Sequence, residues 1–228
     1  MATTTADPTA APLADQARLI RVGEAVRTRL AADPAAYKFP TDRAEIYAFA
    51  DFLSAAECDR FIALVDDVAA PSTVYGDKGE AGYRTSFSGD VDRTDPFVKM
   101  IERRIDDLLG IDPAFGESVQ GQRYTPGQEF RAHYDWFWTL GDYWPDVKAA
   151  GGQRSWTAMA YLNDVEEGGM TEFVPLGISL PPQRGLLLVW NNVTPDGRPN
   201  SDTLHAAQPV VRGTKYVITK WYRTRPWG

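Results

Sequence analysis

The sequence contains very little cysteine and histidine. Cys58 is the only cysteine among 228 residues, which excludes an intramolecular disulfide and is typical of proteins in a reducing compartment. No run approaches the roughly 20 apolar residues that a membrane-spanning helix needs. Residues 1–16 lack the basic start and the apolar run of a secretory signal. The sequence therefore predicts a cytoplasmic protein without a membrane partner.

Basic residues are also scarce relative to acidic ones. There are 24 Lys and Arg against 31 Asp and Glu, which gives a formal net charge of −7. Nucleic-acid binding depends on clustered basic side chains that neutralise phosphates, so a nucleic-acid partner is not expected. A small acidic ligand held by one buried cation is compatible with this balance. With 43% hydrophobic and 12% aromatic residues, the composition is that of a globular protein.

Helical patterns dominate the first half of the chain. Residues 14–32 place apolar side chains at helical spacing, with arginines filling much of the remainder. Ser54 followed by Glu57 is a capping-box pattern, which predicts the start of a second helix. Residues 95–111 form a third amphipathic helical pattern. Residues 71–90 are rich in Gly and polar side chains, and we expect a long loop there, with a strand near residues 84–87 as an alternative within it.

Strand patterns begin with the alternating residues 45–53 and dominate from Glu117 onward. Short β-rich runs follow one another there, separated by Gly, Pro and Asn. Many short strands punctuated by turn signals predict an antiparallel sandwich or barrel. The predicted fold class is α+β, a jelly-roll core with N-terminal supporting helices. We expect residues 1–40 to form a flexible tail and an N-terminal helix, and residues 41–228 to form the main domain.

Both histidines fall in the strand-rich half. His133 and Asp135 are two residues apart, and alternate side chains of a strand share a face, so both can point into one cavity. His205 is the only other histidine and hence the candidate third ligand. Two imidazoles and a carboxylate leave three positions open on an octahedral Fe(II), as in non-haem oxygenases. Zn²⁺ accepts the same ligand types, so ligand identity alone leaves both metals open.

A lysine follows His205 on a predicted strand. Lys215, Val217, Thr219 and Trp221 share one face of that strand. If Trp221 is buried, Lys215 also points inward, where an ammonium group is unfavourable unless an opposite charge pairs with it. A dicarboxylate cosubstrate would supply that charge. An exposed lysine on an edge strand is the alternative.

Four segments carry a resemblance to a known family: "QRYTPGQEFRAHYDWF", "YLNDVEEGGMTEF", "PPQRGLLLVWNN" and "TLHAAQPVVRGTKYVITKWYR". In this order they resemble the prolyl 4-hydroxylase family of Fe(II)/2-oxoglutarate-dependent dioxygenases, and the resemblance extends over about residues 45–225. It implies a double-stranded β-helix, another name for the jelly roll. It also implies that His133, Asp135 and His205 are the iron ligands at the catalytic centre of a dioxygenase domain.

The resemblance implies further contacts with the cosubstrate. Lys215 would pair with the far carboxylate of 2-oxoglutarate, and Tyr124 would support the same carboxylate. Thr171 and Tyr161 are candidates for lining this pocket, with ordinary packing on an inward strand face as an equal alternative. Fe(II), 2-oxoglutarate and O2 are the implied cofactors, and ascorbate is an additional candidate.

On the substrate side, the resemblance places Arg154 and Trp221 near a peptide. An aromatic stretch begins with Trp136 and Trp138, whose rings could stack on proline or pack as a small separate core. Phe130 departs from the family pattern, because some relatives carry Tyr at this position. A hydroxyl that could contact the substrate is therefore missing.

Three functions are compatible with these observations. The leading hypothesis is hydroxylation of an unactivated C–H bond in a prolyl residue of a peptide or protein, coupled to conversion of 2-oxoglutarate and O2 to succinate and CO2. The second is the same chemistry on a small molecule such as a free amino acid. The third is a non-catalytic metal-binding jelly roll, against which the presence of Lys215 and Tyr124 argues. The sequence leaves the oligomeric state open.

Overall fold

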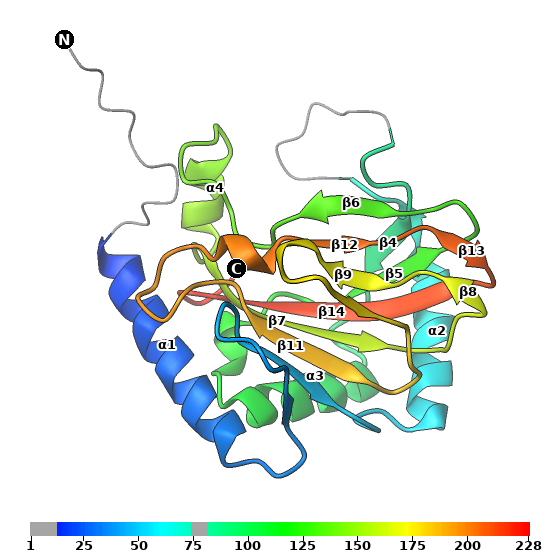
Figure 1. Ribbon diagram of the computed structural model, residues 1–228, viewed down its shortest axis with the longest axis horizontal. Helices are drawn as coiled ribbons and strands as arrows, with labels where there is room; N and C mark the ends of the chain where they lie inside the picture. Colours follow the sequence, from blue (N-terminus) through cyan, green and yellow to red (C-terminus); the bar gives the residue numbers. More distant parts are fainter. Residues whose placement is uncertain (1–12, 74–81) are drawn as a thin grey trace.

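The structure is a computed structural model that describes residues 13–73 and 82–228 (Figure 1). Its longer helices are α1 (Leu13–Ala31), α2 (Ala55–Val68) and α3 (Pro96–Leu109), which confirms the three helices expected from the sequence. Residues 1–12, which belong to the expected flexible tail, lie outside the described residues, as do residues 74–81 of the expected loop. None of the described helices is both long enough and apolar enough to span a membrane.

Local sequence signals set the ends of α2 and α3. The Ser54 side chain accepts a hydrogen bond from the Glu57 N–H, and the Glu57 carboxylate accepts one from the Ser54 N–H. This capping box satisfies two donors that have no partner within the helix. Asp95 caps α3 by accepting from the Phe97 N–H, and Gly110 ends that helix in the left-handed conformation with φ 68°.

Antiparallel sheets form the centre of the fold. The large sheet has eight strands in the order β1-β2-β11-β7-β14-β5-β4-β3, and the small sheet has four in the order β10-β9-β12-β6. Strands β13 and β8 form a separate pair. The predicted α+β fold with a jelly-roll core is therefore confirmed. The strands are β1 (Tyr37–Lys38), β2 (Ile46–Phe49), β3 (Ala70–Pro71), β4 (Phe87–Asp90), β5 (Gln120–Tyr124), β6 (Phe130–His133), β7 (Arg154–Tyr161), β8 (Glu167–Gly168), β9 (Thr171–Phe173), β10 (Ile178–Leu180), β11 (Leu187–Asn191), β12 (His205–Ala207), β13 (Val210–Arg212) and β14 (Lys215–Arg223).

Three elements differ from the expectation. The strand predicted at residues 45–53 is shorter, because β2 ends at Phe49 and the chain turns at Asp51 with φ 52°. Part of the loop predicted at residues 71–90 is sheet, since β3 pairs with β4 and β4 pairs with β5. A short helix, α4 (Trp144–Ala149), lies in the aromatic stretch, where Pro at its first turn fits a helix start.

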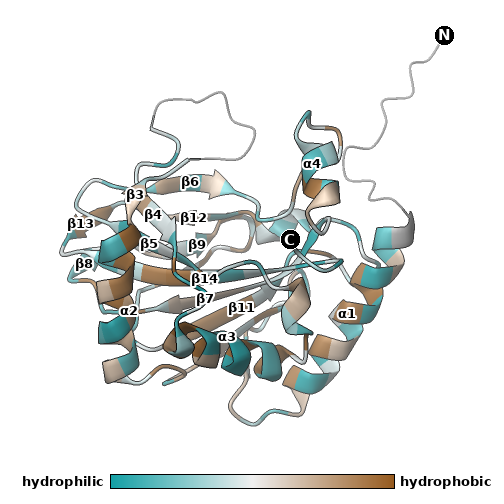
Figure 2. Ribbon diagram, turned by 180° about the vertical axis from the view of Figure 1, so that it is seen from behind, coloured by the Kyte–Doolittle hydropathy of each residue, from teal (hydrophilic) through white to brown (hydrophobic). Residues whose placement is uncertain are grey.

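The large sheet has a different apolar core on each of its faces. Helices α1, α2 and α3 cover one face, as Figure 2 shows, and their apolar sides pack there on residues such as Trp156, Ile218 and Tyr222. The opposite face carries Tyr161 and Val217 and packs toward the small sheet. Alternate residues of β7 and β14 thus serve the helix-facing core and the space between the sheets.

A buried charged cluster joins α3 to β14 within the helix-facing core. The Lys220 ammonium lies 2.9 Å from the Asp106 carboxylate and 3.5 Å from that of Glu102. The Tyr222 hydroxyl donates to Asp106 at 2.6 Å. All of these side chains are almost fully buried, so their charges interact with one another rather than with bulk water.

Candidate active site

Pairing of two strands of the small sheet brings the histidines together. Strands β6 and β12 are antiparallel neighbours, and their register sets His133 directly opposite His205. Asp135 follows β6 by two residues. One ligand atom from each of the three side chains lies within 4.8 Å of the other two. The structure therefore places the three residues predicted as metal ligands in one cluster.

Hydrogen bonds orient the three side chains. The Nδ1 atom of His133 lies 2.8 Å from the Arg131 carbonyl oxygen, and that of His205 lies 2.9 Å from the Thr203 carbonyl oxygen. The other nitrogen of each ring, Nε2, then faces the Asp135 carboxylate. The distance to its nearest oxygen is 4.0 Å from His133 and 3.9 Å from His205. Such bonds fix the tautomer and the ring plane of a metal-binding histidine.

The protonation states also suit metal binding. Burial, together with the neighbouring His205, lowers the pKa of His133 to about 3, so its ring is neutral at physiological pH. Burial raises the pKa of Asp135, but His205 and His133 outweigh this effect and hold the pKa below its ordinary value. The Thr157 hydroxyl donates to this carboxylate at 2.7 Å. Two imidazoles and one carboxylate are a donor set that fits Fe(II) with open positions.

A narrow cavity extends from this cluster between the two sheets. The face of β14 predicted to point inward does so, because Lys215, Val217, Thr219 and Trp221 all line the cavity. The remaining lining residues come from the neighbouring strands and from the segment before β4. They are Arg84, Gln122, Tyr124, Phe130, His133, Asp135, Met159, Thr171, Trp190, His205, Ala206 and Ala207.

Lys215 is the fully buried cation of this cavity, and it has no acidic partner among the described residues. Its side chain is 1% exposed, and the ammonium donates to the Thr171 hydroxyl at 3.2 Å. The rings of Tyr124 and Tyr161 lie 5.5 Å from the same nitrogen. Burial lowers the pKa of Lys215 to about 7. A buried cation without a counter-charge indicates that an anionic ligand completes the site.

The other residues predicted to contact the cosubstrate lie around Lys215. Thr171 and Tyr124 line the cavity, and the Tyr124 hydroxyl donates to Gln122 at 2.8 Å. Tyr161 is fully buried beside the ammonium but does not line the cavity. Its hydroxyl has no hydrogen-bond partner within the described part of the chain. Thr171 therefore lines the cavity, and Tyr161 packs beside the Lys215 ammonium.

The residues predicted on the substrate side divide into two groups. Trp221 lines the cavity, and the Arg154 guanidinium stacks on its ring at 4.0 Å. Arg154 itself lies behind that wall, where it forms an ion pair with Glu117 at 2.6 Å and donates to the Asp135 carbonyl oxygen at 3.4 Å. It is therefore placed to position Trp221 and Asp135 rather than to contact a ligand in the cavity.

Trp136 and Trp138 lie outside the cavity lining and form an aromatic cluster with Tyr134. The Tyr134 and Trp136 rings stack at 4.5 Å, and the Trp138 ring meets Trp136 edge-on at 4.7 Å. Trp136 is buried, while Trp138 is 40% exposed. The residues of the cluster flank the proposed ligand Asp135 in sequence.

Sequence reasoning missed Arg84 and Trp190 on the cavity wall. The Arg84 guanidinium lies over the Phe130 ring at 4.8 Å, and the Phe130 ring stacks on His133 at 3.5 Å. Trp190 meets His205 at 5.0 Å. Arg84 belongs to a polar segment without strand periodicity. Only a comparison of this segment with the family could have indicated a site role for Arg84. Trp190 belongs to a continuous apolar run, which does not reveal the side that faces a ligand.

Comparison with known proteins assigns the family. Residues 119–223 match the sequence model described as the 2OG-Fe(II) oxygenase superfamily. The chain is 34% identical over 199 residues to a probable prolyl 4-hydroxylase 3 of Arabidopsis thaliana, covering 77% of this chain and 68% of that one. It is 33% identical over 202 residues to the human prolyl 4-hydroxylase subunit alpha-1, covering 84% of this chain but 37% of the much longer human one.

A solved structure agrees with this assignment. The viral collagen prolyl hydroxylase of Paramecium bursaria chlorella virus 1, in its 2-oxoglutarate complex, superposes with a TM-score of 0.61. The two sequences are 28% identical, and the match covers 77% of this chain and 94% of the viral one. A prolyl hydroxylase from Trichoplax adhaerens shares the fold, with a TM-score of 0.60 at 14% identity.

Fold and site together define a jelly-roll oxygenase that depends on Fe(II) and 2-oxoglutarate. Within that class, the chain belongs to the prolyl 4-hydroxylase family of Fe(II)/2-oxoglutarate-dependent dioxygenases. The family predicted from the sequence is thus confirmed, as are Fe(II) and 2-oxoglutarate as its cofactors.

Proposed function

We propose that the protein hydroxylates a prolyl residue in a peptide or protein, with His133, Asp135 and His205 holding Fe(II). The observation that carries the site assignment is the buried Lys215, which lines the same cavity as the three ligands and lacks an acidic partner among the described residues. A dicarboxylate that spans the cavity would present one carboxylate to the metal end and the other to this ammonium. 2-Oxoglutarate has this form.

Different residues of the chain bind the cosubstrate and orient the metal ligands. Bound Fe(II), with 2-oxoglutarate and O2, supplies the oxidising chemistry that replaces C–H by C–OH and yields succinate and CO2. Lys215 fixes the far carboxylate by a charge-assisted hydrogen bond in a site without bulk water, and Thr171 holds the ammonium in place. Thr157 keeps the Asp135 carboxylate in its ligating orientation.

The prolyl substrate is supported by the relatives and by the aromatic cluster. Several similar proteins are named as prolyl hydroxylases, among them a viral collagen prolyl hydroxylase. The exposed Trp138 ring, three residues after Asp135 in sequence, is a surface on which a proline ring of a peptide can stack. Trp221, held by Arg154, forms the adjacent wall.

A small molecule such as a free amino acid is the second candidate. Phe130 favours it, because its ring stacks on His133 and offers no hydroxyl to a peptide at the cavity wall. A non-catalytic binding module would not need a buried, unpaired ammonium opposite the metal ligands.

Mass spectrometry of proline-containing peptides and of free proline, incubated with protein, Fe(II), 2-oxoglutarate and air, tests the proposal. We expect one added oxygen on peptidyl proline together with succinate, and neither product with His205→Ala. Succinate with oxidation of free proline alone would favour the second candidate. If no succinate forms under any condition, the oxygenase proposal for this site is wrong.

A further inference from the structure

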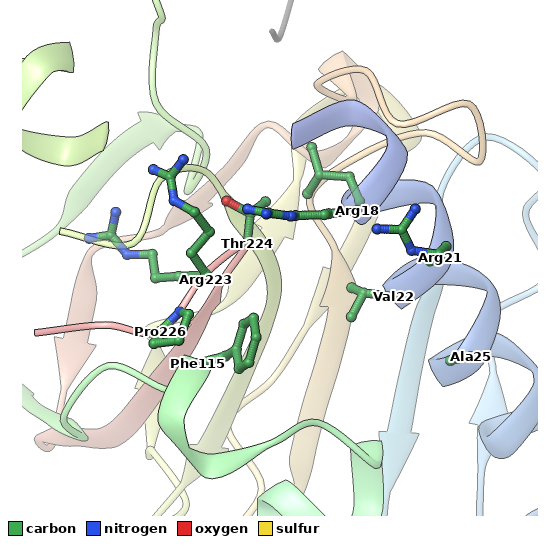
Figure 3. Close-up of a pocket in the computed structure, with 10 residues that line it drawn as sticks. Arg18, Arg21, Val22, Ala25, Phe115, Arg223, Thr224 and Pro226 are labelled. Atoms are coloured by element: carbon green, nitrogen blue, oxygen red, sulfur yellow. The ribbon is translucent and has the colours of Figure 1, made fainter. Parts of the chain in front are cut away.

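A second cavity lies between α1 and the C-terminal end of β14. Its volume is about 500 Å³, within the usual range for small-molecule sites. Figure 3 shows Arg18, Arg21 and Val22 of α1 across the space from Thr224 and Pro226, with Phe115 at its base. We call this space the arginine cavity. The proposed active site does not use it.

The lining of the arginine cavity combines positive charge with apolar surface. Four arginines line it, and no acidic residue does, in a chain whose net charge is −7. The apolar part of the wall consists of Leu19, Val22, Ala25, Phe115 and Pro226. The arginines are Arg18, Arg21, Arg223 and Arg225.

Local carboxylates do not compensate these arginines fully. Asp15 is buried next to the cavity, 3.9 Å from Arg18 and 3.5 Å from Arg225. Arg223 forms an ion pair with Glu117. Among the described residues, Asp15 and Glu117 are the carboxylates that pair with these arginines, and Glu117 is shared with Arg154. Arg21 is exposed and makes no hydrogen bond or ion pair with the described residues. The cavity therefore attracts anions.

We propose that the arginine cavity binds a small organic carboxylate with an apolar body. Guanidinium groups bind carboxylates through paired hydrogen bonds and also stack on flat apolar groups. Arg18 and Arg21, one helical turn apart on α1, would hold the carboxylate. Phe115 and Val22 would contact the apolar body. An inorganic anion would use only the first of these features.

Contacts through the protein link this cavity to the active site. Arg223 and Arg154 both donate to the same oxygen of Glu117, each at 2.6 Å. Arg154 in turn stacks on Trp221 and donates to the carbonyl oxygen of Asp135. A carboxylate held by Arg18 and Arg21 would add a negative charge beside the wall that Arg223 also lines, and would weaken the attraction between Arg223 and Glu117. The shared carboxylate can then shift toward Arg154, which holds one wall of the active site. Occupancy of the arginine cavity would therefore change the affinity for 2-oxoglutarate, a consequence that rests on the proposed function.

Calorimetric titration of metal-free protein with 2-naphthoate tests the site directly. We expect saturable binding of one molecule, with 2-naphthamide, which has the same shape but no charge, at least tenfold weaker. Arg21→Gln should weaken binding at least tenfold, while Arg29→Gln, an exposed arginine on the same helix outside the cavity, should change it less than twofold. Lys215→Met should bind the probe as the wild type does.

Three results would overturn the proposed site: no saturable binding at millimolar probe, equal binding by Arg21→Gln and wild type, or loss of binding in Lys215→Met. The last result would place the probe in the active site. None of these titrations contains iron or 2-oxoglutarate, so they do not depend on the proposed function.

Coupling is tested by measuring the Kd of 2-oxoglutarate with Fe(II), without O2, at zero and saturating 2-naphthoate. We expect at least a twofold change in wild type and none in Arg21→Gln. An unchanged Kd in wild type would refute the link between the sites. Failure of 2-oxoglutarate to bind under any condition would instead count against the proposed function.

Discussion

The charge of Lys215 is tied to the proposed cosubstrate. Lys215→Met should abolish measurable 2-oxoglutarate binding, because the far carboxylate loses the buried ammonium that pairs with it. The same change should raise the free energy of unfolding of the ligand-free protein by about 2–4 kcal/mol at pH 7, because a buried ammonium without a counter-charge is removed. Urea unfolding without ligands measures this, with the exposed Lys99→Met as the control. A destabilised Lys215→Met would contradict the assignment.

The lowered pKa of Lys215 also predicts the pH dependence of cosubstrate binding. The ligand pairs with the protonated amine, whose pKa in the free protein is about 7. The Kd of 2-oxoglutarate should therefore rise with pH above about 7, approaching tenfold per pH unit, and binding should take up a proton. Calorimetry between pH 6 and pH 9 measures both effects. Lys215→Arg stays charged throughout this range and should lack the dependence.

The lowered pKa of Lys215 also affects the stability of the ligand-free protein. Raising the pH weakens cosubstrate binding but should increase the free energy of unfolding. The folded state binds fewer protons than the unfolded chain wherever the pH lies between about 7 and the ordinary lysine pKa of 10.5. The contribution of Lys215 to the free energy of unfolding therefore rises with pH over this window. Below about pH 7 Lys215 is charged in both the folded and the unfolded state. The full free-energy cost of burying its ammonium then lowers the stability.

At the scale of elements, the contact between α3 and β14 depends on the cluster around Lys220. Lys220→Met should lower the free energy of unfolding by about 3–5 kcal/mol, because Glu102 and Asp106 stay buried without their cation. Urea unfolding measures the loss. Combining Lys220→Met with Glu102→Gln and Asp106→Asn removes the uncompensated charges and should recover part of the stability. If the single substitution is neutral, the cluster is not buried in solution.

At the scale of the whole molecule, ligands that bind between the sheets should stabilise the fold. The three proposed iron ligands belong to β6, its following turn and β12, while Lys215 belongs to the large sheet. Fe(II) and 2-oxoglutarate without O2 should raise the free energy of unfolding by about 2.7 kcal/mol when the ligand concentration is 100 times its Kd. Thermal unfolding measures this increase. Asp135→Ala should show none of it, and an equal increase in that variant would place the ligands elsewhere.

The division into residues 1–40 and 41–228 and the cytoplasmic location remain predictions from the sequence. The family, the fold class and the helix starts needed no tertiary information. Ser54 and Glu57 cap α2 because a capping box involves only four consecutive residues. His133 and Asp135 share a site because their spacing is local, and the inward face of β14 follows from its two-residue period.

The tertiary structure decided what long-range pairing controls. The register of β6 against β12 sets His205 opposite His133, although 72 positions separate them in sequence. Glu117 draws Arg154 behind the cavity wall, so this arginine supports Trp221 instead of facing the ligand space. The arginine cavity exists only because α1 packs beside the end of β14. Periodicity depends only on residues that are close in sequence. Contacts between distant segments depend on which of them the folded core brings side by side.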